Sequence, residues 1–571
     1  MASGYNNFDL AIYCTASCLE NNFDQLSKEM DFFQKHLNVT KVYIESHRGD
    51  TTLSKDRLLE LKKFFESRQI KVAGGITPTL GEDCRPGYNR HFGGICYTDP
   101  ASREKFQHVI ELTASVFNEV ILDDFFFTNC GCDDCLTAKG DRTWEEFRLE
   151  LMKNVSEELV IDPAKAVNPY VKMVIKYPNW NESYASSGYN TKEQPAIFDG
   201  IYTGTETRNP AISQQHIPRY ASYSLMRWME NMSPERNGGG WFDSLDCTYI
   251  DYYLEQANLT VFSKAKELTL FCYSILKDSN YVPALGFQLE KLDQLAENVG
   301  NPIGVHVYEP HQGYGEGHLY DYLGMLGIPF ELSPEFPETD VPVLVTANAT
   351  MDELIIEKMK AHLKRGNQVV MTSGFIEKMP PKDVEPFTTL RPTDKQMAIQ
   401  QFAIDTSSCT FDTFTYAKEP ITYPVYDYST NGTWQSVVGM NGQNNIPVVM
   451  YDHYSKGSIY SLIIPNDFAN LWKLPEDVIS KIREVFTKGL FPYKIEGPGN
   501  VGLFSYDNQS LILESFDTVP RTWKIILDKE QELVDLISDR ALEYEAISER
   551  DEKIYNIKIN PCNYKGFKIK S

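Results

Sequence analysis

The sequence has few positive charges for its size. Its 55 Lys and Arg residues are outnumbered by 79 Asp and Glu residues, which gives a formal net charge of -24 at pH 7. No block of basic residues interrupts this excess. Proteins that bind nucleic acid or anionic surfaces present clusters of Lys and Arg. We therefore expect no nucleic-acid partner, and the acidic balance suits a neutral substrate.

Long hydrophobic runs are also absent. No segment reaches the ~18 consecutive apolar residues of a transmembrane helix, and the first residues, MASGYNNFDLAIYC, lack the regions of a signal peptide. The sequence therefore predicts no membrane partner. It leaves the compartment open: the protein would be periplasmic or secreted if a leader had been removed, and cytoplasmic otherwise.

At 571 residues and 65.3 kDa the chain is too long for one ordinary hydrophobic core. Hydrophobic residues make up 42% and aromatic residues 12%, which is enough for large cores and for aromatic walls in a binding cleft. The pattern of apolar residues changes along the chain. We predict three domains, at residues 1–300, 301–488 and 489–571.

The first domain alternates short apolar runs with amphipathic helical stretches, which is the pattern of repeated βα units around a parallel sheet. Eight such strands predict a (β/α)₈ barrel, whose active site lies at the C-terminal strand ends. We expect the strands at Asp9–Cys14, Lys41–Ser46, Lys71–Thr77, Glu119–Asp124, Val171–Pro178, Ile197–Gly204, Gly238–Asp243 and Glu267–Ser274.

The stretch EVILDDFFFTNCGCDDC carries the strongest signal of chemistry. A buried strand ends in two adjacent carboxylates, Asp123 and Asp124, and three phenylalanines follow. Successive strand side chains point to opposite sides, so one aspartate should face the barrel interior while the other faces the helix layer or a loop. Carboxylates in apolar surroundings are paired, hydrogen-bonded, metal-bound or catalytic, or else they simply accept backbone hydrogen bonds in the loop.

Other predicted strand ends carry further polar and aromatic residues. Each one alone is more often solvated, ion-paired or part of the core, but they coincide at one end of the predicted barrel. Carboxylates, cations and aromatic walls together suit a carbohydrate, since rings take the apolar sugar faces and charged groups take the hydroxyls. The candidates are His47, Arg48, Lys176, Tyr177, Trp180, Glu206, Arg208, Trp241, Asp243 and Asp246.

The cysteines Cys130, Cys132 and Cys135 form a CxCxxC run that can be interpreted in three ways. They could hold a structural zinc ion, with the fourth ligand from a neighbouring aspartate or from a distant cysteine such as Cys96. Two of them could form a disulfide, or all three could be free thiols that shape the loop. We expect no cofactor that catalysis requires.

The second domain has the pattern of a flavodoxin-like or glutamine-amidotransferase-like α/β unit. It lacks a nucleophile elbow, and the chain lacks a glycine-rich phosphate loop, so a binding or assembly role is expected instead of chemistry, and with it a homo-oligomer. His306 and Glu309 are expected on the loop that links it to the barrel. Residues 380–428 interrupt the α/β pattern, and the last domain alternates as a small antiparallel β-sandwich.

This order of domains resembles the bacterial β-galactosidases whose middle domain mediates trimerisation, and the hypothetical glycosyl hydrolases related to them. Two stretches support the resemblance: YLEQANLTVFSKAKELTLFCYS is similar to the last helix and strand of those barrels, and DDFFFTNCGCDDC is similar to their cysteine loop. In that family the acid/base follows the fourth strand and the nucleophile the seventh. This chain has Asp123-Asp124 and Asp243 at those places.

The resemblance implies a glycoside hydrolase that acts on an oligo- or polysaccharide with two carboxylates. One assignment makes Asp123 or Asp124 the acid/base and Asp243 the nucleophile. The other, by analogy with α-galactosidase barrels, makes the fourth-strand aspartate the nucleophile and Glu206 the acid. We expect retention of configuration. The alternative hypothesis is a sugar-binding protein or inactive relative that keeps the barrel mouth as a receptor.

Overall fold

The computed structural model describes residues 4–19, 23–80, 93–313, 315–405, 411–442 and 444–570. It forms two compact units, Met1–Glu297 and Asn298–Ser571. The first unit holds the predicted barrel, and the second holds two sheet-rich parts. The division into three domains at residues 300 and 488 stays a prediction.

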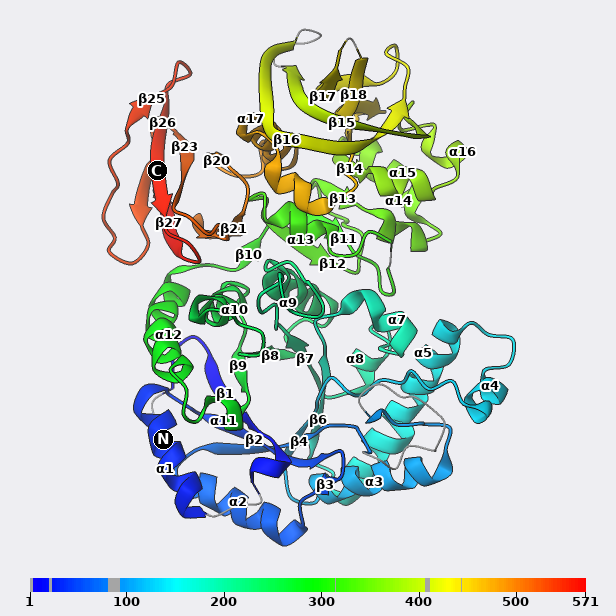
Figure 1. Cartoon of the computed structure of the whole chain (residues 1–571), viewed down its shortest axis with the longest axis vertical. Coiled ribbons are helices and arrows are strands. Elements are labelled where there is room, and N and C mark those ends of the chain that lie inside the picture. Colours follow the sequence, from blue (N-terminus) through cyan, green and yellow to red (C-terminus); the bar gives the residue numbers. More distant parts are fainter. Residues whose placement is uncertain are drawn as a thin grey trace. The chain divides into compact units, whose positions relative to one another are not determined.

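Eight parallel strands close into a barrel, so the predicted (β/α)₈ fold is confirmed (Figure 1). Strand β1 pairs with both β2 and β9, which closes the ring. A two-residue strand, β3 (Thr51–Thr52), folds back on the end of β2. The barrel strands are β1 (Asp9–Cys14), β2 (Lys41–Arg48), β4 (Lys71–Ile76), β5 (Glu119–Leu122), β6 (Lys172–Tyr177), β7 (Gly200–Gly204), β8 (Asn237–Asp243) and β9 (Glu267–Phe271).

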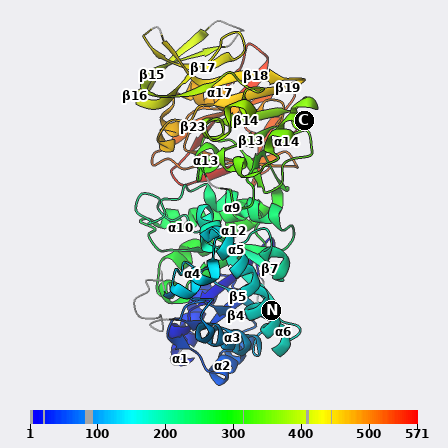
Figure 2. The ribbon, with the colours of Figure 1, turned by 90° about the vertical axis from the view of Figure 1, so that its right-hand side faces the viewer.

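Amphipathic helices surround the strands, and α1 to α3 lie outside β4 and β5 in the view of Figure 2. In α1 the residues Leu26, Met30 and Phe33 are buried at helical spacing. None of the described helices is long and apolar enough to cross a membrane. The helices of this unit are α1 (Phe23–His36), α2 (Lys55–Ser67), α3 (Pro100–Ala114), α4 (Asp133–Lys139), α5 (Trp144–Val155), α6 (Asp162–Val167), α7 (Tyr184–Ser187), α8 (Gln194–Ile197), α9 (Ala221–Met232), α10 (Ile250–Phe262), α11 (Tyr273–Leu276) and α12 (Tyr281–Asn298).

Aromatic side chains fill the barrel interior beneath its mouth. Tyr13 lies against Trp241, with ring centroids 4.6 Å apart, and Tyr43 and Tyr202 belong to the same buried cluster. A Cβ atom on Gly75 would lie 2.6 Å from the Tyr13 ring, so only glycine leaves room for that tyrosine. The interior is therefore a packed core, and in barrels of this kind a ligand binds at the C-terminal strand ends.

The second unit contains a nine-stranded mixed sheet. Five parallel strands, β12, β11, β13, β14 and β19, form the predicted α/β part, and four antiparallel strands extend it. The strands are β11 (Val305–Tyr308), β12 (Phe330–Ser333), β13 (Val343–Val345), β14 (Gln368–Thr372), β15 (Arg391–Asp405), β16 (Phe411–Asp427), β17 (Trp434–Asn441), β18 (Asn444–Tyr454) and β19 (Gly457–Leu462); the helices are α13 (Leu319–Gly324), α14 (Ile355–Lys364), α15 (Ser373–Lys378), α16 (Pro381–Val384) and α17 (Glu476–Thr487).

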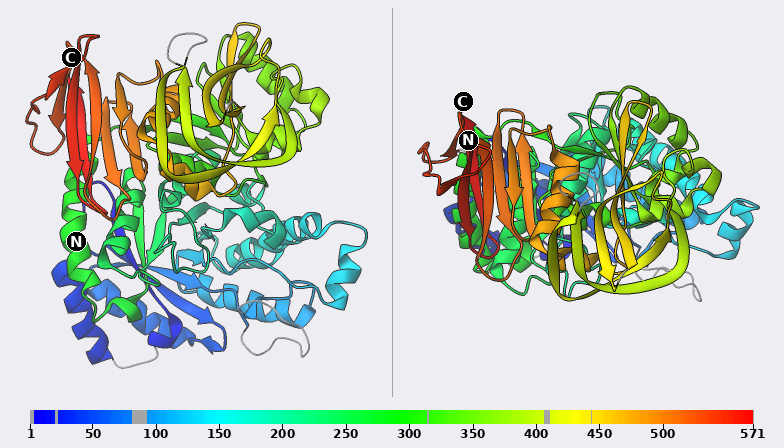
Figure 3. Two further views of the ribbon diagram at one scale, coloured as in Figure 1. Left: turned by 45° about the horizontal axis from the view of Figure 1, so that its top comes forward. Right: turned by 90° about the horizontal axis from the view of Figure 1, so that it is seen from above.

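The last part of the second unit is the expected antiparallel sandwich. Two sheets share one core, to which Trp523, Leu513 and Phe567 contribute. Figure 3 shows these strands in orange and red beside one another, and the long strands of the mixed sheet in yellow. The sandwich strands are β10 (Pro302–Ile303), β20 (Tyr493–Glu496), β21 (Val501–Tyr506), β22 (Ser510–Ser515), β23 (Arg521–Asp528), β24 (Glu532–Asp535), β25 (Ala546–Ile547), β26 (Glu552–Ile559) and β27 (Tyr564–Lys570).

Candidate active site

Five of the predicted charged residues meet at the carboxyl ends of four neighbouring strands. Asp123 and Asp124 follow β5, Lys176 lies near the end of β6, Glu206 follows β7, and Asp243 ends β8. Because β5 to β8 are consecutive in the parallel sheet, their ends lie side by side. The carboxylates are therefore gathered on one half of the barrel mouth.

Lys176 is the centre of this cluster. Its ammonium nitrogen lies 2.9 Å from Asp124 Oδ2 and 2.8 Å from Glu206 Oε1, and 3.6 Å from Asp123 Oδ1. The lysine side chain is only 1% exposed, and its nitrogen lies 4.5 Å from the centre of the Trp241 ring. A buried ammonium group needs compensating negative charge, and these carboxylates supply it.

The two carboxyl groups that contact Lys176 most closely hold their protons more tightly than usual. Burial raises the pKa of Asp124 to about 7, and the negative charges of Asp123 and Glu206 act in the same direction. Burial also raises the pKa of Glu206, with a further contribution from Asp243. The second carboxyl oxygen of Glu206 is buried without a hydrogen-bond partner within the described structure. The two carboxyl groups of Asp124 and Glu206 thus share contact with one ammonium group.

Asp123 has a different environment. It accepts hydrogen bonds from Arg48 Nη2 at 2.9 Å and from its neighbour's backbone, Asp124 N, at 2.9 Å. Although burial opposes ionisation, Lys176 and Arg48 lower the pKa of Asp123. Arg48 also contacts Glu45 Oε1 at 2.9 Å, so one guanidinium group joins two buried carboxylates.

Glu45 is a site residue that the sequence analysis missed. It lies inside β2 with no exposed surface, and it accepts hydrogen bonds from Tyr13 Oη at 2.9 Å and from Ala16 N at 2.7 Å. Thr77, beyond β4, donates to Glu45 at 2.6 Å and to Asp123 at 3.2 Å. The signal was available in KVYIES, where the glutamate shares the inward alternation of Tyr43.

Arg208 and Asp243 form a two-pronged ion pair. The guanidinium nitrogens Nε and Nη2 lie 2.9 and 2.7 Å from the two oxygens of Asp243. Gln256 on α10 fixes both partners, because it accepts from Arg208 N at 3.1 Å and donates to the Asp243 carbonyl at 2.8 Å. Both oxygens of Asp243 are therefore engaged by one rigid cation.

Only some of the other candidates lie where a ligand could reach them. Trp180 is half-buried and meets Phe127 edge-on. Trp241 is buried inside the barrel, and Tyr177 is buried against Tyr184 and Tyr189, so neither presents an accessible face. His47 bonds Thr52 and the Thr79 carbonyl, and so fastens the β2–β3 hairpin. Asp246 is exposed on the turn beyond β8.

His306 and Glu309 belong to the second unit. The prediction that His306 lies on a linking loop is wrong. His306 lies within β11, because the apolar residues around it continue the strand. Its ring contacts the Glu335 carbonyl. Glu309 follows β11 and is 3% exposed. Asn348 donates to both carboxyl oxygens of Glu309 at 2.9 Å, and burial raises the pKa of Glu309 to about 8.

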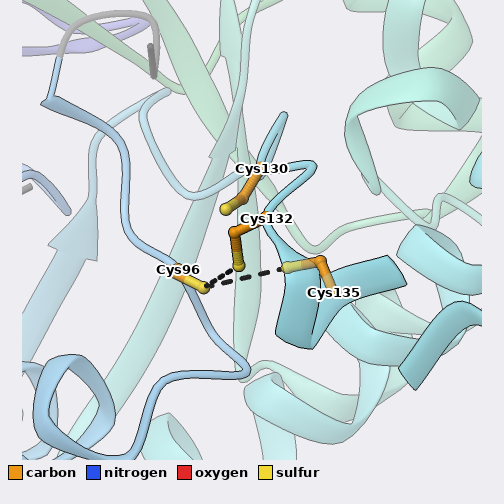
Figure 4. Close-up of side chains that lie close together, drawn as sticks. All are labelled: Cys96, Cys130, Cys132 and Cys135. Carbon is orange, nitrogen blue, oxygen red and sulfur yellow. Dashed lines mark hydrogen bonds between the residues drawn. The ribbon is translucent and has the colours of Figure 1, made fainter. Parts of the chain in front are cut away.

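The three cysteines of the CxCxxC run converge with the distant Cys96 (Figure 4). All four sulfur atoms lie within 4.8 Å of one another, and Cys96 Sγ is 3.7 Å from Cys132 Sγ and 3.8 Å from Cys135 Sγ. Four sulfur atoms around one zinc ion, each about 2.3 Å from it, are about 3.8 Å apart. The cluster therefore fits a structural zinc ion with four cysteine ligands. The neighbouring aspartates are exposed.

Comparison with solved structures places the whole chain on a known fold. The β-galactosidase from Rahnella sp. R3 has a TM-score of 0.66 and 13% identity, over 100% of this chain and 99% of that one. The β-galactosidase from Bacillus circulans sp. alkalophilus has a TM-score of 0.63 and 11% identity, over 99% of each chain. At this identity the likeness concerns the fold.

Sequence comparison identifies the family. The chain is 28% identical over 497 residues to the uncharacterised protein SSO3021 of Saccharolobus solfataricus, which covers 80% of this chain and 81% of that protein. Residues 300–467 match the second domain of SSO3021, and residues 492–569 match the C-terminal domain of the probable glycosyl hydrolases. Residues 1–289 match the catalytic domain "Probable glycosyl hydrolase", so the chain belongs to this family of glycoside hydrolases.

Proposed function

We propose that the protein cleaves a glycosidic bond with retention of configuration, using Asp124 as the acid/base and Glu206 as the nucleophile. The observation that carries this proposal is the shared contact with Lys176, at 2.9 Å from Asp124 and 2.8 Å from Glu206. Two carboxyl oxygens on one nitrogen atom are less than about 6 Å apart, which is close to the roughly 5 to 5.5 Å of retaining enzymes and below the roughly 6.5 to 9.5 Å of inverting ones.

The charge of Lys176 also makes the protonation states of Asp124 and Glu206 different. Its single positive charge compensates one carboxylate, so the other keeps its proton to higher pH. Asp124, with a pKa of about 7, also lies next to the ionised Asp123, and its side chain is 21% exposed, compared with 5% for Glu206. The more accessible, protonated aspartic acid suits the leaving oxygen, and the buried carboxylate suits the anomeric carbon.

The reaction then has two balanced steps. Glu206 attacks the anomeric carbon while the bond to the leaving oxygen breaks and the Asp124 proton passes to that oxygen. Water next attacks the anomeric carbon, gives its proton to Asp124 and releases Glu206. Asp243 is a weaker candidate for the nucleophile, because Arg208 occupies both of its oxygens.

The substrate class follows from charge and shape. Among the described residues of the mouth, carboxylates outnumber cations, and the cations Arg48, Lys176 and Arg208 are each paired with a carboxylate. A neutral sugar is therefore a better substrate than a uronic acid. The half-buried Trp180, which follows β6 and packs against Phe127 and Tyr189, offers an aromatic surface at the same strand ends. The proposed substrate is a neutral oligo- or polysaccharide.

The test begins with aryl glycosides and oligosaccharides, which should release reducing ends. On the substrate that is cleaved, Asp124→Asn should lower kcat/KM at least about 100-fold when the leaving group is a sugar, and far less when it is a dinitrophenolate that needs no proton. Glu206→Gln should lower the rate roughly 1,000-fold or more on every substrate. The exposed Glu182→Gln serves as the matched control and should keep normal rates.

The same experiment separates the alternatives. NMR of the first product should show the anomeric configuration of the substrate, and an inverted first product would reject the proposed mechanism. Normal rates in Asp124→Asn or Glu206→Gln would reject this pair of residues. Calorimetric binding of sugars without any reducing ends would instead support the receptor hypothesis.

A further inference from the structure

We propose that Asp123, the first of the paired aspartates, is a positioning residue, which fixes the loop that carries Asp124 and supplies the negative charge that keeps Asp124 protonated. This inference rests on the proposed role of Asp124 as the acid/base. It assigns the two adjacent carboxylates separate tasks and extends the site to Glu45 and Arg48, neither of which contacts the proposed reacting pair.

The geometry for the first task is a chain of contacts between the buried carboxylates Glu45 and Asp123 through the half-buried Arg48. Glu45, fixed by Tyr13 and Ala16 N, contacts Arg48 at 2.9 Å, and Arg48 Nη2 contacts Asp123 Oδ2 at 2.9 Å. Asp123 Oδ1 then accepts from Asp124 N at 2.9 Å. The backbone of Asp124 is thus tied to strands β2 and β5. Tyr189 Oη holds the Asp124 carbonyl at 2.7 Å from the other side.

The charges around Asp124 explain the second task. Lys176 favours its ionised form, whereas Asp123 and Glu206 favour its protonated form. Arg208 contributes a further positive charge, and Tyr184 and Tyr189 lie close enough to interact with the same carboxylate, although their hydroxyl groups donate to the backbone carbonyls of Pro178 and Asp124. Asp123 itself stays ionised, because Arg48 and Lys176 flank it. It is therefore a permanent negative charge beside the acid.

The test compares pH profiles. In the wild-type enzyme, kcat/KM should fall above about pH 7 as Asp124 loses its proton. Asp123→Asn keeps the size and one of the two acceptor oxygens but removes the charge, so the basic limb should move down by about 1 pH unit. The protonated fraction of Asp124 at pH 7, and with it kcat/KM, should then fall roughly 5-fold. The loss should be larger for sugar leaving groups than for dinitrophenolate.

A second variant tests the same contacts in case Asp123→Asn does not fold. Arg48→Lys keeps the charge, but an ammonium group cannot bond Glu45 and Asp123 as the forked guanidinium does. It should lower kcat on sugar leaving groups more than on dinitrophenolate, while KM changes little. If both variants fail to fold, ¹³C NMR titration of the carboxyl groups, compared between the wild-type chain and Asp123→Glu, gives the pKa of Asp124. Asp123→Glu keeps the negative charge and should leave that pKa within a few tenths of a unit.

Different results would overturn the positioning role of Asp123 and the proposed role of Asp124 as the acid. An unchanged basic limb in Asp123→Asn overturns the positioning role. If the fall of kcat/KM at high pH disappears in Asp123→Asn while rates on dinitrophenolate stay normal, Asp123 is itself the acid. That result also overturns the positioning role. If instead Asp124→Asn keeps the wild-type limb, the acid assignment of Asp124 fails whatever Asp123 does.

Discussion

At the scale of single residues, Lys176 decides whether the carboxylate cluster is tolerated. Removal of one partner from a buried ionic group leaves unpaired charge, which costs about 3 to 5 kcal/mol. Lys176→Met fills the same space and leaves Asp123, Asp124 and Glu206 to repel one another. We predict a free energy of unfolding of the barrel lower by about 3 to 5 kcal/mol at pH 8.

The pH dependence of this loss follows from the carboxyl groups. Without the ammonium group the pKa values of Asp124 and Glu206 in the folded state rise further above the unfolded values of about 4, so the folded variant binds more protons than the unfolded chain. Stability of the variant therefore falls as pH rises above about 4, and the difference from wild type should be larger at pH 8 than at pH 5.

Urea unfolding followed by tryptophan fluorescence at pH 5 and pH 8 measures both effects. Lys172→Met is the matched control, because Lys172 is an exposed lysine on the same strand, and its midpoint should not change. A constant difference between the two pH values would show that Lys176 acts through packing and not through charge.

The sequence identified most charges of the site but not their pairing. Alternation and strand ends pointed to Asp123, Asp124, Lys176 and Glu206, because consecutive parallel strands end on one face. Glu45 was missed because the candidates were taken from the residues that follow the predicted strand Lys41–Ser46, whereas Glu45 lies within the strand and only its alternation with Tyr43 indicates that it faces inward. Trp241 was expected at the mouth, yet it packs against Tyr13 and beneath Lys176, since a position near a strand end does not reveal depth in the barrel.

At the scale of elements, apolar runs located every barrel strand, and their ends differed by a few residues. The predicted strand Ile197–Gly204 begins only at Gly200, because α8 continues to Ile197. Residues 380–428 broke the α/β pattern, and the structure shows why: β15 and β16 are long strands paired with each other in antiparallel fashion. Such pairing joins segments through a register that local composition does not specify.

The cysteine loop gives the element-scale prediction. If Cys96, Cys130, Cys132 and Cys135 hold zinc, the ion joins the segment before α3 to the start of α4. We predict about one zinc ion per chain, and Cys132→Ser should abolish it and lower the melting temperature of the barrel, because the folding energy of a zinc site is lost with the metal. Metal analysis combined with thermal unfolding measures both.

Cys18→Ser is the control for the cysteine loop, because Cys18 lies outside the cluster and contacts Thr15, which a serine could still bond. Metal content and melting temperature should stay at wild-type values in this variant. Purified chain without metal, with four titratable thiols in the loop and an unchanged melting temperature, would contradict the zinc site and favour free thiols. Two fewer thiols would favour a disulfide.

At the scale of the whole molecule, we propose that the chain forms a homo-oligomer through its second unit. Within the described structure, β16 is the edge strand of the mixed sheet, where it carries Phe414 and Tyr416, which are 51% and 63% exposed. These residues are two apart on a strand and so lie on the same face. Exposed aromatic residues on a long edge strand are suited to pairing with another chain.

The last prediction tests this surface. A chain with a net charge of -24 resists non-specific association, so an oligomer at low ionic strength would indicate a specific interface. Phe414→Lys combined with Tyr416→Lys should shift sedimentation velocity profiles from the oligomer to the monomer, because a lysine at an edge strand opposes pairing. Tyr170→Lys, at an 87% exposed tyrosine of the barrel unit, should leave the oligomer intact. A monomeric wild type would reject the homo-oligomer. A double variant that stays oligomeric would show that the interface does not include this part of β16.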